Sequence, residues 1–283
     1  MTAALLITAG FAVLQFVVAF TTDSLALLSD AAHMLTDVIG LLMALGAILL
    51  AQHSRPTHRR TFGMYRTEVL AALGNAVLLF GVAGYVTYEA FGRIGDPPEV
   101  PGLPVLVVAA IGLLANAVAF FLLRTGANES LNVRGAYLEV VADMIGSVGV
   151  LVSGAVTLTT GWRYMDPIVG VLIGVYVLPR TFLLAKRALR ILLQHAPKET
   201  DVARIDAELS ELGGVCEVHD LHVWTLTSGM DVVSAHLTVT EESDGSRILA
   251  AAQELLTSRH SIEHATLQLE AREAPGQCQG RSW

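Results

Sequence analysis

Long apolar runs constrain this chain more than any other feature, because a helix needs about 20 apolar residues to cross the core of a bilayer. The chain has six such runs, which extend over residues 3–20, 25–51, 69–91, 103–123, 131–158 and 167–184. Prolines and glycines punctuate the gaps between them, as is typical of loops. We therefore predict six membrane-spanning helices, and an even number places both ends of the chain on the same side.

The composition agrees with a membrane protein. Of the 283 residues, 53% are hydrophobic and 16% are charged, and the mean hydropathy is +0.56. These values are too apolar for an ordinary soluble domain. After about Pro197 charged residues become frequent and the apolar runs shorten to the length of strands, so we expect a soluble domain to follow the membrane domain. The net charge of −8 argues against a nucleic-acid partner.

Two smaller features bear on processing and redox state. The first Lys or Arg is Arg55, so the opening run lacks the positive segment of a signal peptide and is expected to be a retained span. Cys216 and Cys278 are too few for a disulfide framework.

Basic residues predict the orientation of the helices. Most of them follow the second, fourth and sixth runs: Arg55, Arg59, Arg60, Arg66, Arg124, Arg134, Lys186, Arg187 and Arg190. The opposite loops carry Arg93 and Arg163 beside acidic residues. By the positive-inside rule we expect both termini and the soluble domain in the cytoplasm.

The soluble part alternates between helical and strand-like periods. Helices are predicted over residues 201–212 and 247–259, and strands over 215–226, 232–239 and 265–270. This αββαβ order with antiparallel strands suits a small ferredoxin-like α+β sheet. The predicted domains are a six-helix transmembrane transport domain over residues 1–190, a cytoplasmic α+β domain over 191–272, and a flexible tail over 273–283.

Two pairs of ionisable residues lie inside the apolar runs. His33 and Asp37 are four residues apart, and so are Glu139 and Asp143. On an α-helix this spacing puts both members of a pair on one face, one turn apart. Ionisable groups at membrane depth are costly and indicate function by default. We expect each pair to be the partner of the other.

One imidazole and three carboxylates suit a tetrahedral site for a divalent first-row metal. With all three carboxylates ionised the site carries a formal charge near −3, so it requires a dication or protons in a low dielectric. Protons and the metal would then compete for the same ligands, which is a mechanism of exchange. A buried hydrogen-bond network or proton wire without metal is the alternative.

Other residues of the runs predict helix packing. Gln15, Asn75 and Asn116 are expected to form hydrogen bonds between helices. Small residues near the charged pairs would let the second and fifth helices approach closely: Gly40, Gly46, Gly146 and Gly149.

Several stretches together resemble the signature sequences of the cation diffusion facilitator family, most closely its zinc-transporter branch. They are LSDAAHMLTD at 28–37, FGMYRTEVLAA at 62–72, NVRGAYLE at 132–139, the Asp166–Pro167 pair and VHDLHVW at 218–224. The likeness runs in order along nearly the whole chain. It implies a homodimeric, proton-coupled exporter of divalent metal, a secondary active transporter rather than an enzyme, in the plasma (inner) membrane of a bacterium.

The resemblance also implies metal-binding residues. It places the transport site on the second and fifth helices, although Glu139 stands where a histidine is expected. Zinc is the first expectation from the resemblance. Because a carboxylate at position 139 favours harder metals, cadmium, cobalt, manganese and iron are alternatives; Glu139 could instead carry protons beside a three-ligand site. In the cytoplasmic domain the resemblance implies a further, structural metal near the dimer interface at His219, His236, His264, Glu270 and Cys278.

Two other functions are compatible with a membrane-bound metal site. A membrane-anchored metal sensor would bind metal in its soluble domain without transport, but it would not need matched carboxylates inside the membrane. An intramembrane metal hydrolase is disfavoured, because the chain has no HExxH motif.

Overall fold

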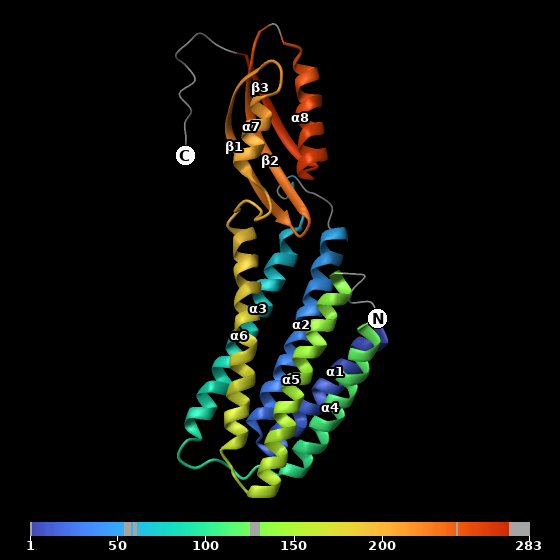
Figure 1. The fold of residues 1–283 in the computed structure, drawn as a ribbon, viewed down its shortest axis with the longest axis vertical. Coiled ribbons are helices and arrows are strands. Elements are labelled where there is room, and N and C mark those ends of the chain that lie inside the picture. The colour runs from blue at the N-terminus through green and yellow to red at the C-terminus, as the bar shows by residue number, and fades with distance from the viewer. Residues whose placement is uncertain (1, 54–57, 59–60, 125–130, 242, 272–283) are drawn as a thin grey trace. The chain divides into compact units, whose positions relative to one another are not determined.

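The computed structural model describes residues 2–53, 58, 61–124, 131–241 and 243–271. The chain divides into two compact units (Figure 1). The first unit contains residues 1–46 and 71–185, and the second contains residues 47–70 and 186–283.

Six apolar helices precede the sheet, as predicted (Figure 1). They are α1 (Thr2–Thr22), α2 (Leu25–His53), α3 (Arg66–Gly92), α4 (Gly102–Leu123), α5 (Leu131–Thr160) and α6 (Met165–Leu192). Within the described residues, α2 to α6 are long and apolar enough to cross a membrane, and α1 adds a shorter apolar segment, Ala9–Thr22.

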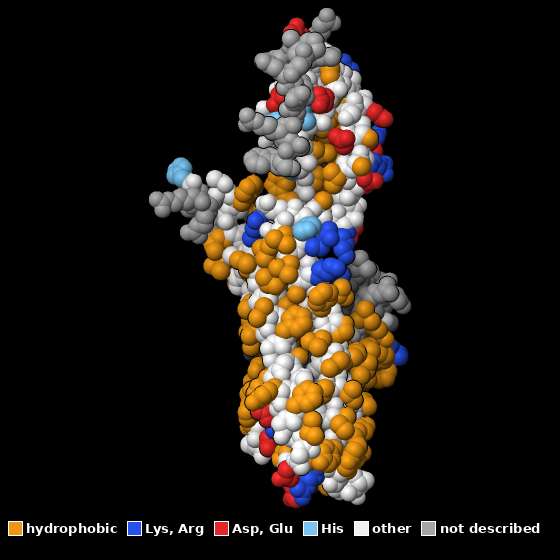
Figure 2. Space-filling model, turned by 90° about the vertical axis from the view of Figure 1, so that its left-hand side faces the viewer, with side chains coloured by type: hydrophobic (Ala, Val, Ile, Leu, Met, Phe, Trp, Pro, Cys, Tyr) orange, Lys and Arg blue, Asp and Glu red, His pale blue; other side chains and the backbone are white. Residues whose placement is uncertain are grey.

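The helices of the first unit bury one cluster of apolar side chains and expose many large ones. Leu27 of α2, Val105 of α4 and Val150 of α5 belong to one buried cluster. Leu114 and Leu172, in contrast, are exposed, and hydrophobic side chains dominate the visible surface of the helices (Figure 2). Such a surface suits contact with lipid rather than with water.

Two of the three predicted polar contacts between helices are confirmed. Gln15 of α1 donates a hydrogen bond from Nε2 to Oδ2 of Asp30 on α2, at 2.5 Å. Asn116 of α4 donates from Nδ2 to Oγ of Ser147 on α5, at 3.4 Å. The buried Oδ1 of Asn75 has no hydrogen-bond partner among the described residues, so that contact is not confirmed.

Three of the four glycines singled out by sequence lie at close helix contacts. A Cβ atom built on Gly40 would lie 2.6 Å from the side chain of Asn75, and one on Gly146 would lie 2.7 Å from Asp30. Gly149 lies against α6, but Gly46 has no neighbour within 4 Å of such an atom. Gly146 is therefore a position where α5 closely approaches the charged segment of α2.

The second unit contains the αββαβ order predicted from the sequence. Its elements are α7 (Val202–Ser210), β1 (Val215–Thr227), β2 (Met230–Val239), α8 (Gly245–His260) and β3 (His264–Ala271). The strands lie in the order β1-β2-β3, and β1 and β2 are antiparallel. The prediction of antiparallel strands is wrong for β3, which runs parallel to β2. The reason is α8, which carries the chain back to the end of the sheet where β2 begins.

The sheet is covered by helices on one face. Val233 and Leu237 of β2 pack with Ile205 of α7 and Leu256 of α8 in one buried cluster. Because side chains alternate between the faces of a strand, residues at even positions of β2 and β3 point to the opposite face.

An acidic residue, Glu208, links α7 to α8. Glu208 of α7 accepts hydrogen bonds from Nε of Arg204, at 2.8 Å, and from Nε2 of His260 on α8, at 3.0 Å. Both hydrogen bonds hold the pKa of the Glu208 carboxyl below its usual value, and the bond from Arg204 has the larger effect.

Candidate metal centres

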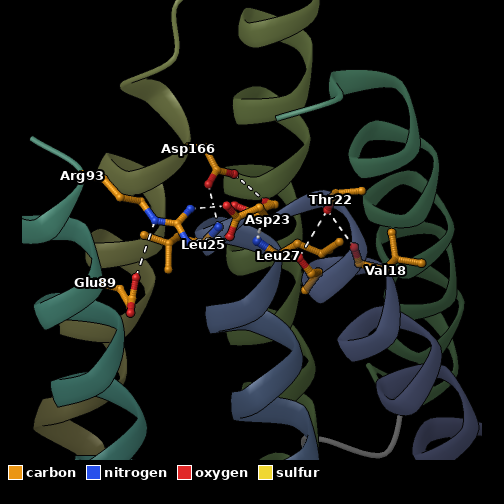
Figure 3. Close-up of polar contacts among 10 residues, drawn as sticks. Val18, Thr22, Asp23, Leu25, Leu27, Glu89, Arg93 and Asp166 are labelled. Atoms are coloured by element: carbon orange, nitrogen blue, oxygen red, sulfur yellow. Dashed lines mark hydrogen bonds and ion pairs between the residues drawn. The ribbon is translucent and has the colours of Figure 1, made fainter. Parts of the chain in front are cut away.

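The start of α2 is held by a carboxylate from another helix (Figure 3). Asp166 of α6 is buried and accepts hydrogen bonds from the backbone N–H of Leu25, at 2.6 Å, and from Oγ of Ser24, at 2.5 Å. Ser24 in turn accepts a bond from the N–H of Leu27, at 3.1 Å. Asp166 thus satisfies the first N–H groups of α2, which otherwise lack partners. This contact sets the position of α2 against α6.

An ion pair fixes the turn before α2. Nη2 of Arg93, at the end of α3, lies 2.7 Å from Oδ1 of Asp23, and Nη1 donates to the Asp23 carbonyl at 2.6 Å. Glu89, one turn earlier on α3, lies 3.8 Å from the same guanidinium (Figure 3). Asp23 has a positive φ of 55°, which Asp adopts more readily than most residues. The turn and the cap together hold the helix that carries His33 and Asp37.

The two ionisable pairs of α2 and α5 lie together. Nε2 of His33 is 3.6 Å from Oδ2 of Asp37 and 3.7 Å from Oδ1 of Asp143. One ligand atom each from His33, Asp37 and Glu139 lie within 4.8 Å of one another. His33 is buried and the three carboxylates are partly buried. The structure therefore brings His33, Asp37 and Glu139 into one group and places Asp143 beside His33.

Two of the distances in this cluster suit a small metal ion. In a tetrahedron with bonds of about 2.0–2.2 Å, neighbouring ligand atoms lie roughly 3.3–3.6 Å apart. The two separations measured from His33, 3.6 and 3.7 Å, are close to that range. Oδ1 of Asp143 and Nδ1 of His33 are buried and form no hydrogen bond within the described residues. Unsatisfied polar atoms of this kind in a buried site call for a partner.

Two charged residues at this site escaped the sequence analysis. Asp30 lies one turn before His33 on α2. It is buried, and its Oδ2 accepts the hydrogen bond from Gln15. Arg180 of α6 donates a hydrogen bond from Nη1 to Oε1 of Glu139. Both stand inside apolar runs, so the cost of a charge at membrane depth was a signal that could have found them.

A second cluster lies on the sheet face opposite α7 and α8. His219 of β1 is directly across from His236 of β2, and their ring centroids are 5.2 Å apart. Glu270 of β3 lies beside both histidines: Nε2 of His219 is 3.2 Å from Oε2, and Nδ1 of His236 is 2.9 Å from Oε1. Glu270 pairs with Thr238, two residues beyond His236 on the same face, so the register of the strands produces the cluster.

The two other residues predicted for this site are not part of the cluster. His264 starts β3 and Glu270 lies near its end. Six residues of strand separate them by about 20 Å, so one chain does not bring His264 to the cluster. Cys278 lies outside the described residues.

The fold and the two clusters define the class of protein. A bundle of bilayer-length helices that carries a metal-competent cluster, followed by an α+β domain with another, is an integral membrane protein that handles metal cations. Residues 1–193 match the cation efflux transmembrane domain, and residues 197–272 match the cation efflux protein, cytoplasmic domain. The chain belongs to the cation efflux family of membrane transporters, which confirms the resemblance found in its sequence.

Three relatives illustrate the similarity. The metal cation efflux system protein CzcD of Cupriavidus metallidurans is 44% identical over 94% of this chain and 84% of its own length. A cadmium, cobalt and zinc/H(+)-K(+) antiporter of Bacillus velezensis is 36% identical over 92% of this chain and 84% of its own. The zinc transporter ZitB of Escherichia coli is 38% identical over 95% and 86%, respectively.

Proposed function

We propose that this protein exports Zn²⁺ or a related divalent metal from the cytoplasm in exchange for protons, and that His33, Asp37, Glu139 and Asp143 form its transport site. The observation that carries the proposal is the convergence of these four side chains from α2 and α5 inside apolar helices. An uncompensated group of carboxylates is expensive at this depth, and a dication compensates it.

Exchange follows from the chemistry of the ligands. Carboxylates and imidazole bind a metal only in their deprotonated forms, so metal binding releases protons and protonation releases metal. If the site opens first to the cytoplasm and then to the opposite side, a proton gradient directed inward drives metal outward. The protein then acts as a secondary active transporter.

The relatives support the choice of cargo. Their names state cadmium, cobalt and zinc for the Bacillus velezensis protein and zinc for the Escherichia coli protein. Zinc is the first candidate for this chain, with cadmium and cobalt next. Glu139 adds a third carboxylate to the site, which keeps manganese and iron as candidates as well.

The cytoplasmic domain is proposed to hold a metal ion of its own. His219, His236 and Glu270 offer two imidazoles and a carboxylate on the open face of the sheet. We place this domain and both termini in the cytoplasm, on the charge bias of the loops, and the protein in a bacterial plasma membrane as a homodimer. If two sheets face each other in that dimer, His264 and Cys278 of the partner chain are candidates for the remaining ligands.

Proteoliposomes that contain a zinc-sensitive dye test the function. We expect Zn²⁺ to enter when the interior is more acidic than the exterior, and a protonophore to stop its entry. Neutralising Asp37 and Asp143 together, as Asp37→Asn with Asp143→Asn, should reduce entry to the level of protein-free vesicles. Asp96→Asn, which neutralises an exposed loop carboxylate, is the matched control and should transport normally. Zinc binding without any flux would instead support the membrane-anchored sensor.

A further inference from the structure

Arg180 brings a positive charge to the candidate transport site from a third helix. It lies well inside α6, which extends over Met165–Leu192. Its guanidinium donates a hydrogen bond from Nη1 to Oε1 of Glu139 on α5. Neither the spacing of the sequence nor the similarity to relatives assigns a role to this residue.

The charge of Arg180 is permanent. A guanidinium is always protonated in proteins and has no acceptor atom, so it cannot bind a metal or exchange a proton. Its side chain is 59% exposed, and that of Glu139 is 27% exposed. An Arg near a helix end can extend to the membrane surface, but this one turns to a carboxylate of the metal-competent cluster. The question is therefore why Arg180, which can neither bind a metal nor exchange a proton, pairs with Glu139; the explanation lies in the charge of the site.

A charge count supplies it. Within the quartet, the three ionised carboxylates contribute −3 and the guanidinium of Arg180 contributes +1, which leaves −2 with His33 neutral. Asp30 is counted apart from the quartet, because its Oδ2 accepts a hydrogen bond from Gln15. A net charge of −2 matches a single dication. Without Arg180 a loaded site would keep one excess negative charge at membrane depth, where such charges are costly.

We propose that Arg180 is the fixed countercharge of the transport site: it holds Glu139 and cancels its charge, so that His33, Asp37 and Asp143 bind the dication. Arg180 is thus a positioning residue that acts through Glu139 and sets how tightly the site binds. The proposal rests on the proposed function, because it assumes that the quartet is the transport site.

The test is a double-mutant cycle on the full-length protein in detergent. Each variant also carries His219→Gln and His236→Gln, so that the cluster on the sheet does not contribute. The dissociation constant for Zn²⁺ is measured at one pH by competition with a metal-sensitive dye, and size-exclusion chromatography establishes that each variant is folded. The variants are Arg180→Gln, Glu139→Gln, the combination of both, and Arg180→Lys.

If Arg180 is a countercharge, the two single substitutions should shift the dissociation constant for Zn²⁺ in opposite directions. Arg180→Gln leaves the site with an extra negative charge and should bind Zn²⁺ more tightly, by at least roughly tenfold. Glu139→Gln leaves a cation beside the site and should bind more weakly by a similar factor. The combination restores the net charge and should return the dissociation constant to within a few-fold of its original value, and Arg180→Lys should keep it there. Arg187→Gln, two turns further along α6 and exposed, is the matched control and should have no effect.

Two outcomes would overturn the proposal without touching the proposed function. If Arg180→Gln leaves the dissociation constant unchanged, Arg180 is only a surface residue. If the combination binds as weakly as Glu139→Gln alone, Glu139 is a metal ligand rather than the partner of a countercharge. The proposed function itself fails if Asp37→Asn with Asp143→Asn leaves Zn²⁺ binding in this background intact.

Discussion

At the scale of single residues, the contact between α2 and α5 depends on the absence of a side chain. A Cβ atom on Gly146 would lie 2.7 Å from Oδ1 of Asp30, a distance that real Cβ atoms do not tolerate. Asp30 cannot move aside freely, because it is buried and its Oδ2 accepts the bond from Gln15. Glycine at 146 therefore allows α5 to bring Asp143, one turn earlier, to His33.

We expect Gly146→Ala to push α5 away from α2. Overpacking of this kind costs about 1–3 kcal/mol of stability, and the separation of Asp143 from His33 should weaken Zn²⁺ binding. Thermal unfolding and dye competition on the purified protein measure both effects. Gly46→Ala is the control, since no atom of another part of the described chain lies within 4 Å of its added Cβ. Alanine is the better helix former by about 1 kcal/mol, so stability should hold or rise. Equal behaviour of the two variants would mean that the helices do not need this contact.

At the scale of elements, the sequence predicted what depends on local spacing. The pairs His33/Asp37 and Glu139/Asp143 could be placed on helix faces because four residues make one turn. Their meeting could be inferred only because each pair needed a partner inside the membrane. The αββαβ order of the soluble domain followed from changes of period along the chain in the same way.

The sequence could not predict contacts that depend on how distant elements are arranged. The direction of β3 depends on the path of α8, and the pairing of Arg180 with Glu139 depends on where α6 lies beside α5. The resemblance grouped His264 with Glu270, although the two stand at opposite ends of one strand. It also contained Asp166, but only the structure assigns that residue a role, as the cap of α2.

The cap leads to a prediction for α2. Asp166→Asn should lower the thermal stability of the protein by about 1–3 kcal/mol, because an amide is a poorer acceptor and leaves buried donors of Ser24 and Leu25 less well satisfied. The metal site on the same helix should then bind Zn²⁺ more weakly. Asp23→Asn is the matched control: it neutralises a carboxylate in the adjacent turn that is 62% exposed, and exposed ion pairs contribute about 0–1 kcal/mol. A loss of stability in the control as large as that of Asp166→Asn would contradict a special role for the cap.

At the scale of the whole molecule, the two metal-competent clusters have different origins. His33, Asp37, Glu139 and Asp143 meet in the first unit because two helices present matched turns. His219, His236 and Glu270 meet in the second because strand register aligns them on one face. The clusters share no residue and belong to separate units, so changes to one should not alter the ligands of the other.

We therefore expect the full-length protein to bind Zn²⁺ in two independent classes of site. His236→Gln should remove one class and leave proton-driven uptake into proteoliposomes measurable, whereas Asp37→Asn with Asp143→Asn should remove the other class together with uptake. The measurements are metal content after equilibrium dialysis and dye-detected flux on the same preparations. His264→Gln distinguishes a site within one chain from a shared one, since its side chain lies about 20 Å along β3 from Glu270 of the same chain. If His264→Gln also removes Zn²⁺ from the cytoplasmic site, the ion there is shared with the strand end of a second chain. If His236→Gln stops flux, the two sites are coupled rather than independent.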